Sequence, residues 1–149
     1  MGRPAAPSTV STSPVATLLG WLGVIPFVTF ALDGWLDWHG WSDLTLLLKT
    51  YALLILSFLC GCLWLEALKA DHRLALIASN LIVLVGWPLI LVPVALAGLM
   101  LAVLFVTVWF GERLVAEDRP GWYQRLRSRL SISVAVLLAT GALGHLFHG

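Results

Sequence analysis

The sequence predicts an all-α integral membrane protein: a bundle of five transmembrane helices with the N-terminus inside and the C-terminus outside. Three observations lead to this prediction. Of the 149 residues, 60% are hydrophobic and only 11% are charged, whereas soluble domains carry about 25% charged residues. The apolar residues gather in runs long enough to cross a bilayer as helices. Eight of the nine Lys and Arg residues then fall on one side of that bilayer.

Each predicted span is one of these apolar runs. The first two cover residues 15–32 and 44–65. The next run, residues 74–111, contains 38 residues without a charge. As one helix it would measure about 57 Å, against a hydrocarbon core of roughly 30 Å. Pro88 and Pro93 therefore divide it into spans at 74–90 and 93–110, and the fifth span covers 130–147. All five are expected to be helical, because a segment in lipid must satisfy its own backbone hydrogen bonds.

The distribution of positive charge sets the orientation. With five spans, the segments 66–73 and 111–129 face the same side as Arg3 and collect every Lys and Arg except Lys49. Cytoplasmic loops carry an excess of Lys and Arg. This side is therefore predicted to be the inside of a bacterial inner (plasma) membrane, with a mitochondrial inner membrane as the less favoured location. Merging the third and fourth spans would place the two segments on opposite sides and remove the bias.

The chain is predicted to hold one membrane domain, residues 15–149, after a disordered tail at 1–14 that is rich in Ser, Thr and Pro. A cleaved signal peptide is the alternative for the first span, because Arg3 precedes it and Thr29-Phe30-Ala31 fits a cleavage site. The length of the run 15–32 favours a retained anchor. The net charge of +1 argues against binding to nucleic acid, which requires a basic face.

The segment between the first two spans, residues 33–43, has the most unusual composition. Three Trp residues recur at three-residue spacing among three Asp residues and one His. Trp is typical of the membrane interface, so an interfacial belt is the simplest interpretation. The alternative is a zinc or manganese site with oxygen and imidazole ligands, although no recognised ligand spacing is present. Its ligands would be Asp33, Asp37, His39 and Asp43. We predict no bound metal and no cofactor.

Two polar residues within the predicted spans are candidate functional residues. Lys49 lies about 7.5 Å from the start of its helix, so its side chain can extend toward the headgroups. An ion pair with Asp33, Asp37 or Asp43 would neutralise it, and a role in transport or proton transfer is the alternative. Asn80 is expected to form an interhelical hydrogen bond rather than to bind a substrate.

Cys60 and Cys62 in the second span are separated by one glycine. Successive helical residues differ in direction by about 100°, so the two thiols point to roughly opposite faces. They can neither bind one ion together nor form an unstrained disulfide. Ser57 and Gly61, four residues apart, instead indicate a small-residue face that permits close helix contact.

The segment 119–129 begins with Arg-Pro-Gly and is expected to continue as a short helix that leads into the fifth span. Such a helix can lie at anionic lipid headgroups, with its Trp inserted and its arginines on phosphates. A signal for orientation alone would explain the same charges. Trp122 and Leu126 share one stripe of this helix, and we predict that both point inward.

Three stretches of this sequence resemble a known family of membrane proteins. Pro120-Gly-Trp122-Tyr123-Gln-Arg-Leu126-Arg127 is similar to its Pro-x-Trp-aromatic-x-x-Leu-Arg signature. Gly23-Val-Ile-Pro26-Phe27 and Leu56-Ser57-Phe58-Leu59-x-Gly61-x-x-Trp64 are similar to two further stretches. The family is domain of unknown function 3429, which includes transmembrane protein 69. The resemblance implies a five-span protein of a bacterial or mitochondrial inner membrane, with no assigned activity. The candidate residues that it selects are Pro26, Ser57, Gly61, Trp64, Pro120, Trp122, Tyr123, Leu126 and Arg127. Because the resemblance singles out Arg127, we predict that this residue forms a bidentate pair with a phosphate or with a carboxylate such as Glu112 or Glu66.

The chain departs from the family at one informative position. Relatives commonly read Gly-Gly-x-His-Trp-Gly, or Arg in place of the His, where this chain reads Cys60-Gly61-Cys62-Leu63-Trp64-Leu65. Leu63 therefore stands where an ionisable residue would be the first candidate for catalysis. We expect no chemistry here that depends on that residue.

Three functions compete, because no residue cluster predicts a reaction. The favoured one is a non-enzymatic accessory or assembly subunit, in a larger membrane complex or a homo-oligomer. It is favoured by the small-residue faces, by the small number of spans, and by an expected absence of buried ionisable groups. The second is an oligomeric small-solute transporter or channel, and the third is a metal-dependent membrane-embedded enzyme that uses the loop 33–43. A transporter would need a polar stripe formed by Thr50, Ser57, Ser79, Asn80 and Thr107.

Overall fold

The computed structural model describes residues 14–36, 42–115 and 119–148, and within these ranges the chain is helical with short turns and no strand. Five helical segments are long and apolar enough to cross a membrane, which confirms the predicted all-α architecture. The elements are α1 (Pro14–Leu22), α2 (Ile25–Leu36), α3 (Ser42–Lys69), α4 (Arg73–Gly86), the 3₁₀ helix η1 (Trp87–Leu91), α5 (Val94–Val115) and α6 (Gly121–His148).

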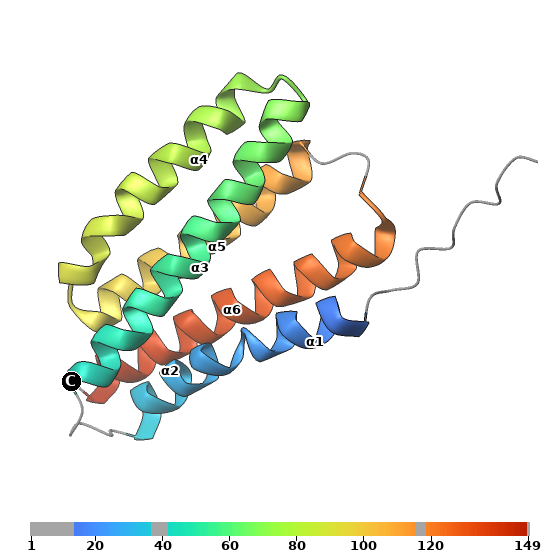
Figure 1. Ribbon diagram of the computed structural model, residues 1–149. Helices are drawn as coiled ribbons and strands as arrows, with labels where there is room; N and C mark the ends of the chain where they lie inside the picture. Colours follow the sequence, from blue (N-terminus) through green and yellow to red (C-terminus); the bar gives the residue numbers. More distant parts are fainter. Residues whose placement is uncertain (1–13, 37–41, 116–118, 149) are drawn as a thin grey trace, which may run out of the picture.

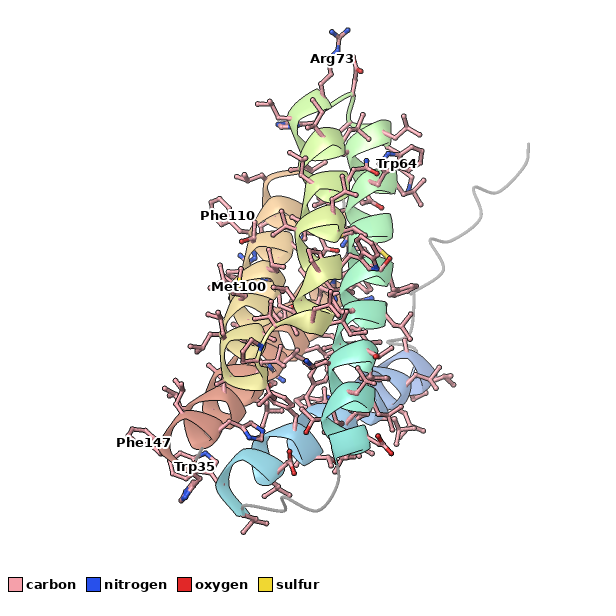
Figure 2. All side chains as sticks on the ribbon, turned by 90° about the vertical axis from the view of Figure 1, so that its left-hand side faces the viewer. Trp35, Trp64, Arg73, Met100, Phe110 and Phe147 are labelled. Carbon is pink, nitrogen blue, oxygen red and sulfur yellow. The ribbon has the colours of Figure 1, made fainter. Side chains whose placement is uncertain are left out.

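The helices form two groups that share α5. Figure 1 shows α6 lying along α1 and α2, while α3 and α4 run beside α5. The helix α5 packs against both α6 and α3 and so joins the two groups. Large apolar side chains cover the outside of the bundle, and Figure 2 shows Met100 and Phe110 projecting away from it. An apolar exterior of this kind is what a lipid-facing surface requires.

The two ends of the bundle differ in charge. The turn between α3 and α4 and the start of α6 lie at the same end, because Arg119 approaches Glu66 to 3.4 Å. We call this end, with Lys69, Arg73, Arg113, Arg119 and Arg127, the arginine-rich end. Figure 2 places Arg73 there and Trp35 and Phe147 at the opposite end. The positive residues of the two segments thus lie at one end of the bundle, as the five-span arrangement predicts.

Several helices extend beyond their predicted bounds, and two of these extensions change an assignment. The helix α6 begins at Gly121 rather than near residue 130, so the expected short helix is the first part of α6 itself. Pro120 suits this start, because it has no N–H to leave unbonded, and its carbonyl accepts from the backbone N–H of Tyr123 at 3.0 Å. The helix α2 continues to Leu36. Asp33 therefore lies within a helix, which corrects its assignment to the loop.

The first span is broken at Gly23–Val24, where α1 ends and α2 begins. Pro26 explains the break. It lacks the N–H that would continue the helical hydrogen bonds, and its ring would clash with a carbonyl group of the preceding turn. The hydroxyl of Tyr51 on α3 donates to the carbonyl of Gly23 at 3.0 Å. Phe27 follows, fully buried against the rings of Tyr51 and Phe105. This stretch of the family resemblance thus forms an anchored kink.

Glycines allow α2 and α6 to pack backbone to backbone. A Cβ atom on Gly34 would collide with the carbonyl oxygen of Gly141, and one on Gly144 would lie 2.5 Å from the backbone of Gly34. The indole N–H of Trp35 also donates to the carbonyl of Thr140 at 3.1 Å. Close approach through small residues is the usual way that helices associate in lipid.

Lys49 closes the opposite end of the α3–α4–α5 group. Its Nζ donates to the carbonyls of Ile90 at 2.8 Å and Val92 at 3.0 Å, where η1 ends. No following helical turn supplies N–H donors to these two carbonyls, so the ammonium group of Lys49 donates to them instead. The predicted ion pair with Asp33 or Asp43 was wrong, and Asp37 lies outside the described residues.

We expect Gly144→Ala to destabilise the bundle by about 2–3 kcal/mol, because its methyl group would press against the backbone of Gly34. Gly61→Ala is the matched control, since no atom lies within 4 Å of a Cβ at that position. The measurement is thermal unfolding of the purified chain in detergent. Equal melting temperatures for the two variants would contradict close packing of α2 on α6.

Candidate functional site at the arginine-rich end

A buried carboxylate, Glu112, lies at the centre of the arginine-rich end. It occupies the last turns of α5 and its residue is only 4% exposed. Arg127 of α6 donates to it through two parallel bonds, from Nε to Oε2 and from Nη2 to Oε1, each 2.9 Å long. The predicted bidentate pair is confirmed, and Glu112 is its partner. The planar guanidinium matches the two carboxylate oxygens, which an ammonium group cannot do.

Arg119 extends this pair to a third helix. Its guanidinium lies 3.9 Å from the carboxylate of Glu112 and 3.4 Å from that of Glu66 on α3. Glu66 in turn pairs with Lys69 at 3.3 Å. The ring of Tyr123 packs beneath Arg119, with the guanidinium carbon 5.2 Å from the ring centre. This chain of charges, which we call the charge network, fastens α3, α5 and α6 together.

A second set of polar contacts joins α5 and α6 beside the charge network. The hydroxyl of Ser128 donates to the carbonyl of Gln124 at 2.8 Å. It accepts from Trp109 Nε1 at 3.1 Å and from Arg113 Nη2 at 3.0 Å. Arg113 also lies over the Trp109 ring, 5.2 Å from its centre. The hydroxyl of Ser128 therefore has both donor and acceptor functions satisfied, as a buried polar group requires.

The charge network leaves little free space beside it. The cavity beside it, which Glu112, Arg119 and Arg127 help to line, measures about 40 Å³. That volume holds a water molecule or two, whereas sites for organic ligands occupy about 300–1,000 Å³. Both oxygens of the Glu112 carboxylate are engaged by Arg127.

The remaining residues of this motif surround the charge network. Leu126 points inward and lines an apolar cavity together with Tyr123. Trp122 packs edge-on against the Tyr123 ring, and its Nε1 is buried without a hydrogen-bond partner among the described residues. The inward direction predicted for Trp122 and Leu126 agrees with these positions.

The motif in α3 lies on a different surface. Ser57, Gly61 and Trp64 line a groove of about 410 Å³ between α3 and α4, together with Ser79 and Asn80 of α4. Figure 2 shows Trp64 on the outside of α3, toward the arginine-rich end. The structure thus brings predicted candidate residues from both helices together on one face.

Cys60 also lines this groove, whereas Leu63 is buried behind it. Leu63 is 1% exposed and packs on Gly111 of α5. An ionisable residue in its place would lie in the core, next to the end of α5. Cys60 is buried, Cys62 is partly exposed, and both thiols are free, in agreement with the opposite directions expected from their spacing.

The structure describes two of the four residues proposed as metal ligands, Asp33 and Asp43. Asp33 is 6% exposed and its Oδ2 lies 3.4 Å from Nε2 of His145 on α6, while Asp43 is exposed at the start of α3. Asp37 and His39 fall outside the described residues. Within the described ranges, no three His, Cys, Asp or Glu side chains are grouped so that they could hold a metal ion.

Sequence reasoning named Glu112 and Asp33 but missed their burial, so the expected absence of buried ionisable groups was wrong. Glu112 and Asp33 each follow directly after an apolar run, and that position was interpreted as the start of a loop. The helices continue past both residues. The available signal was a partner at the matching depth of α6: Arg127 for Glu112, and His145 for Asp33.

The architecture and the charge network define a multi-pass helical membrane protein in which a buried Arg–carboxylate pair joins the helices at one end. A known family, described as Protein of unknown function (DUF3429), matches residues 12–143. The chain therefore belongs to this family, as the three motifs predicted. Among proteins with curated descriptions and among solved structures, none matches the chain.

We expect Arg127→Lys to lower the free energy of unfolding by about 1.5–3 kcal/mol, because lysine can replace only one of the two charge-assisted bonds to Glu112. Arg125→Lys is the control, since Arg125 is exposed and the positive charge is kept. Melting temperatures in nanodiscs would compare the two variants. Equal and negligible shifts would reduce this part of α6 to an orientation signal.

Proposed function

We propose that the chain is a non-enzymatic accessory or assembly subunit of a bacterial inner membrane, which binds a transmembrane helix of a partner protein along the groove between α3 and α4. The observation that supports this proposal is the presence of exposed polar side chains in that groove, on the outside of the bundle. Ser57 and Asn80 are both exposed there. In a membrane, exposed polar groups of this kind are matched by a neighbouring helix.

The groove has the features that a helix contact needs. Asn80 donates from Nδ2 to the carbonyl of Leu76 at 2.9 Å. No donor to its side-chain oxygen is found among the described residues. Around Gly61 nothing lies within 4 Å of where a Cβ would be, so an approaching backbone meets no obstacle. Trp64, 44% exposed, closes the groove toward the arginine-rich end. A partner helix with a small residue opposite Gly61 and a donor opposite Asn80 fits this face.

The positions of the polar residues favour this function over a transporter or channel. The hydroxyls of Thr50 and Thr107 donate to the carbonyls four residues earlier, at 2.8 and 2.9 Å. Ser79 donates within its own helix to Leu76. These groups are satisfied locally and lie on three different helices, so the described residues form no continuous polar path. The small cavity at the charge network likewise favours a non-enzymatic role.

We expect Gly61→Leu to release the chain from its complex, because the larger side chain fills the groove where no internal contact is disturbed. The control is Leu54→Phe on the same helix, at a position that is 64% exposed and outside the groove. Both variants would be extracted in mild detergent and compared by native mass spectrometry for bound subunits of fixed stoichiometry.

The outcomes of this experiment separate the occupants of the groove. A hetero-complex that Gly61→Leu dissociates, with an unchanged melting temperature of the isolated chain, supports the proposal. A homodimer that dissociates in the same way would replace the partner with a second copy. A wild-type chain that is monomeric in native membranes would exclude an assembly role.

We also propose that the arginine-rich end faces the cytoplasm, where Arg125 and Arg129, both exposed, meet anionic headgroups. A topology reporter fused after His148 should then be active only outside the cytoplasm. A reporter inserted near Arg119 should be active only inside. A cytoplasmic reporter at the C-terminus would overturn this orientation.

A further inference from the structure

A large apolar cavity opens where α1 diverges from the bundle. It measures about 380 Å³ and lies between the first span, α3, α5 and the start of α6. The kink at Gly23 creates it, because α2 packs closely along α6 whereas α1 touches α6 only lightly. Leu19, Phe27 and Phe105 are among its walls. This volume falls within the range of small-molecule binding sites, which are concave and mostly apolar.

One side of the cavity carries a buried polar group without a partner. Ser131 of α6 is 4% exposed, and its hydroxyl has no hydrogen-bond partner among the described residues. Burying an unpaired hydroxyl is unfavourable, so an acceptor within the cavity would remove this penalty. Arg127 and Tyr123 line the cavity nearer to the arginine-rich end. The polar groups therefore follow one edge of a site that is otherwise apolar.

We propose that this cavity binds one acyl chain of an anionic glycerophospholipid. The phosphate lies at the arginine-rich end near Tyr123 and Arg127, and the ester carbonyl accepts the hydroxyl hydrogen of Ser131. The acyl chain then extends between Leu19 and Phe105. This site is separate from the groove between α3 and α4 and requires no protein partner.

Charge and spacing both support this ligand. The segments 66–73 and 112–129 together contain seven Lys and Arg residues and five Asp and Glu residues. This excess of positive charge attracts an anion even with Arg127 paired to Glu112. Ser131 lies one helical turn, about 6 Å, deeper than Arg127. A glycerophospholipid presents its polar groups in the same order, with phosphate at the surface and ester carbonyls beneath it.

The test uses the full purified chain and native mass spectrometry, with phosphatidylglycerol, phosphatidylcholine of the same acyl chains, and palmitic acid as probes. Leu19→Trp should block the cavity and abolish the retained phosphatidylglycerol. Leu18→Trp is the matched control, because both leucines are 61% exposed and only Leu19 lines the cavity. Ser131→Ala keeps the fold and removes the donor, so phosphatidylglycerol should bind about tenfold more weakly, as expected for one lost hydrogen bond.

Each outcome decides the proposal. Retention of one phosphatidylglycerol by the wild type and Leu18→Trp, with weaker phosphatidylcholine and reduced binding in Ser131→Ala, supports it. Equal lipid retention in Leu18→Trp and Leu19→Trp would overturn it, as would unchanged affinity in Ser131→Ala. Preferential retention of palmitic acid would assign the site to a free fatty acid instead. Because Gly61→Leu leaves this cavity intact, lipid binding and subunit binding can fail separately.

Discussion

The bidentate pair between Glu112 and Arg127 is the interaction on which the arginine-rich end depends. Two charges removed from water are tolerated only when their geometry is good and their remaining bonding groups are satisfied. The geometry is good here, since each bond is 2.9 Å long, and Arg119 adds a second cation 3.9 Å from Glu112. The pair fixes the rotation of α6 relative to α5. That rotation in turn directs Leu126 and Ser131 toward the apolar cavity.

The opposite end is held by contacts of a different kind. Gly34, Gly141 and Gly144 bring α2 and α6 together, and Lys49 closes the end of η1. The bundle is therefore tightly packed at this end. Toward the arginine-rich end it is looser around α1, because the kink before Pro26 separates that helix from its neighbours. The same kink that ends one helix thus creates the space for a lipid.

The three stretches that resemble the family acquire three separate physical roles. The stretch around Pro26 forms the kink and binds Tyr51. The stretch from Leu56 to Trp64 presents the exposed groove between α3 and α4. The stretch from Pro120 to Arg127 starts α6 and supplies the guanidinium for Glu112. Two of these stretches pack the helices together and one forms an exposed groove. This division fits a protein that acts through contacts with lipid and other helices.

The sequence by itself determined the class, the number of spans and the motifs. Apolar runs of fixed length and a one-sided charge distribution are properties of the chain alone, because the thickness of the bilayer sets the length of each helix. The bidentate role of Arg127 was also predicted, because the family resemblance singles out this arginine and its planar guanidinium matches a carboxylate. Only the tertiary structure decided that Glu112 and Asp33 are buried and that Lys49 binds carbonyls. Those outcomes depend on which helices are neighbours and at what depth, and hydropathy does not encode this information.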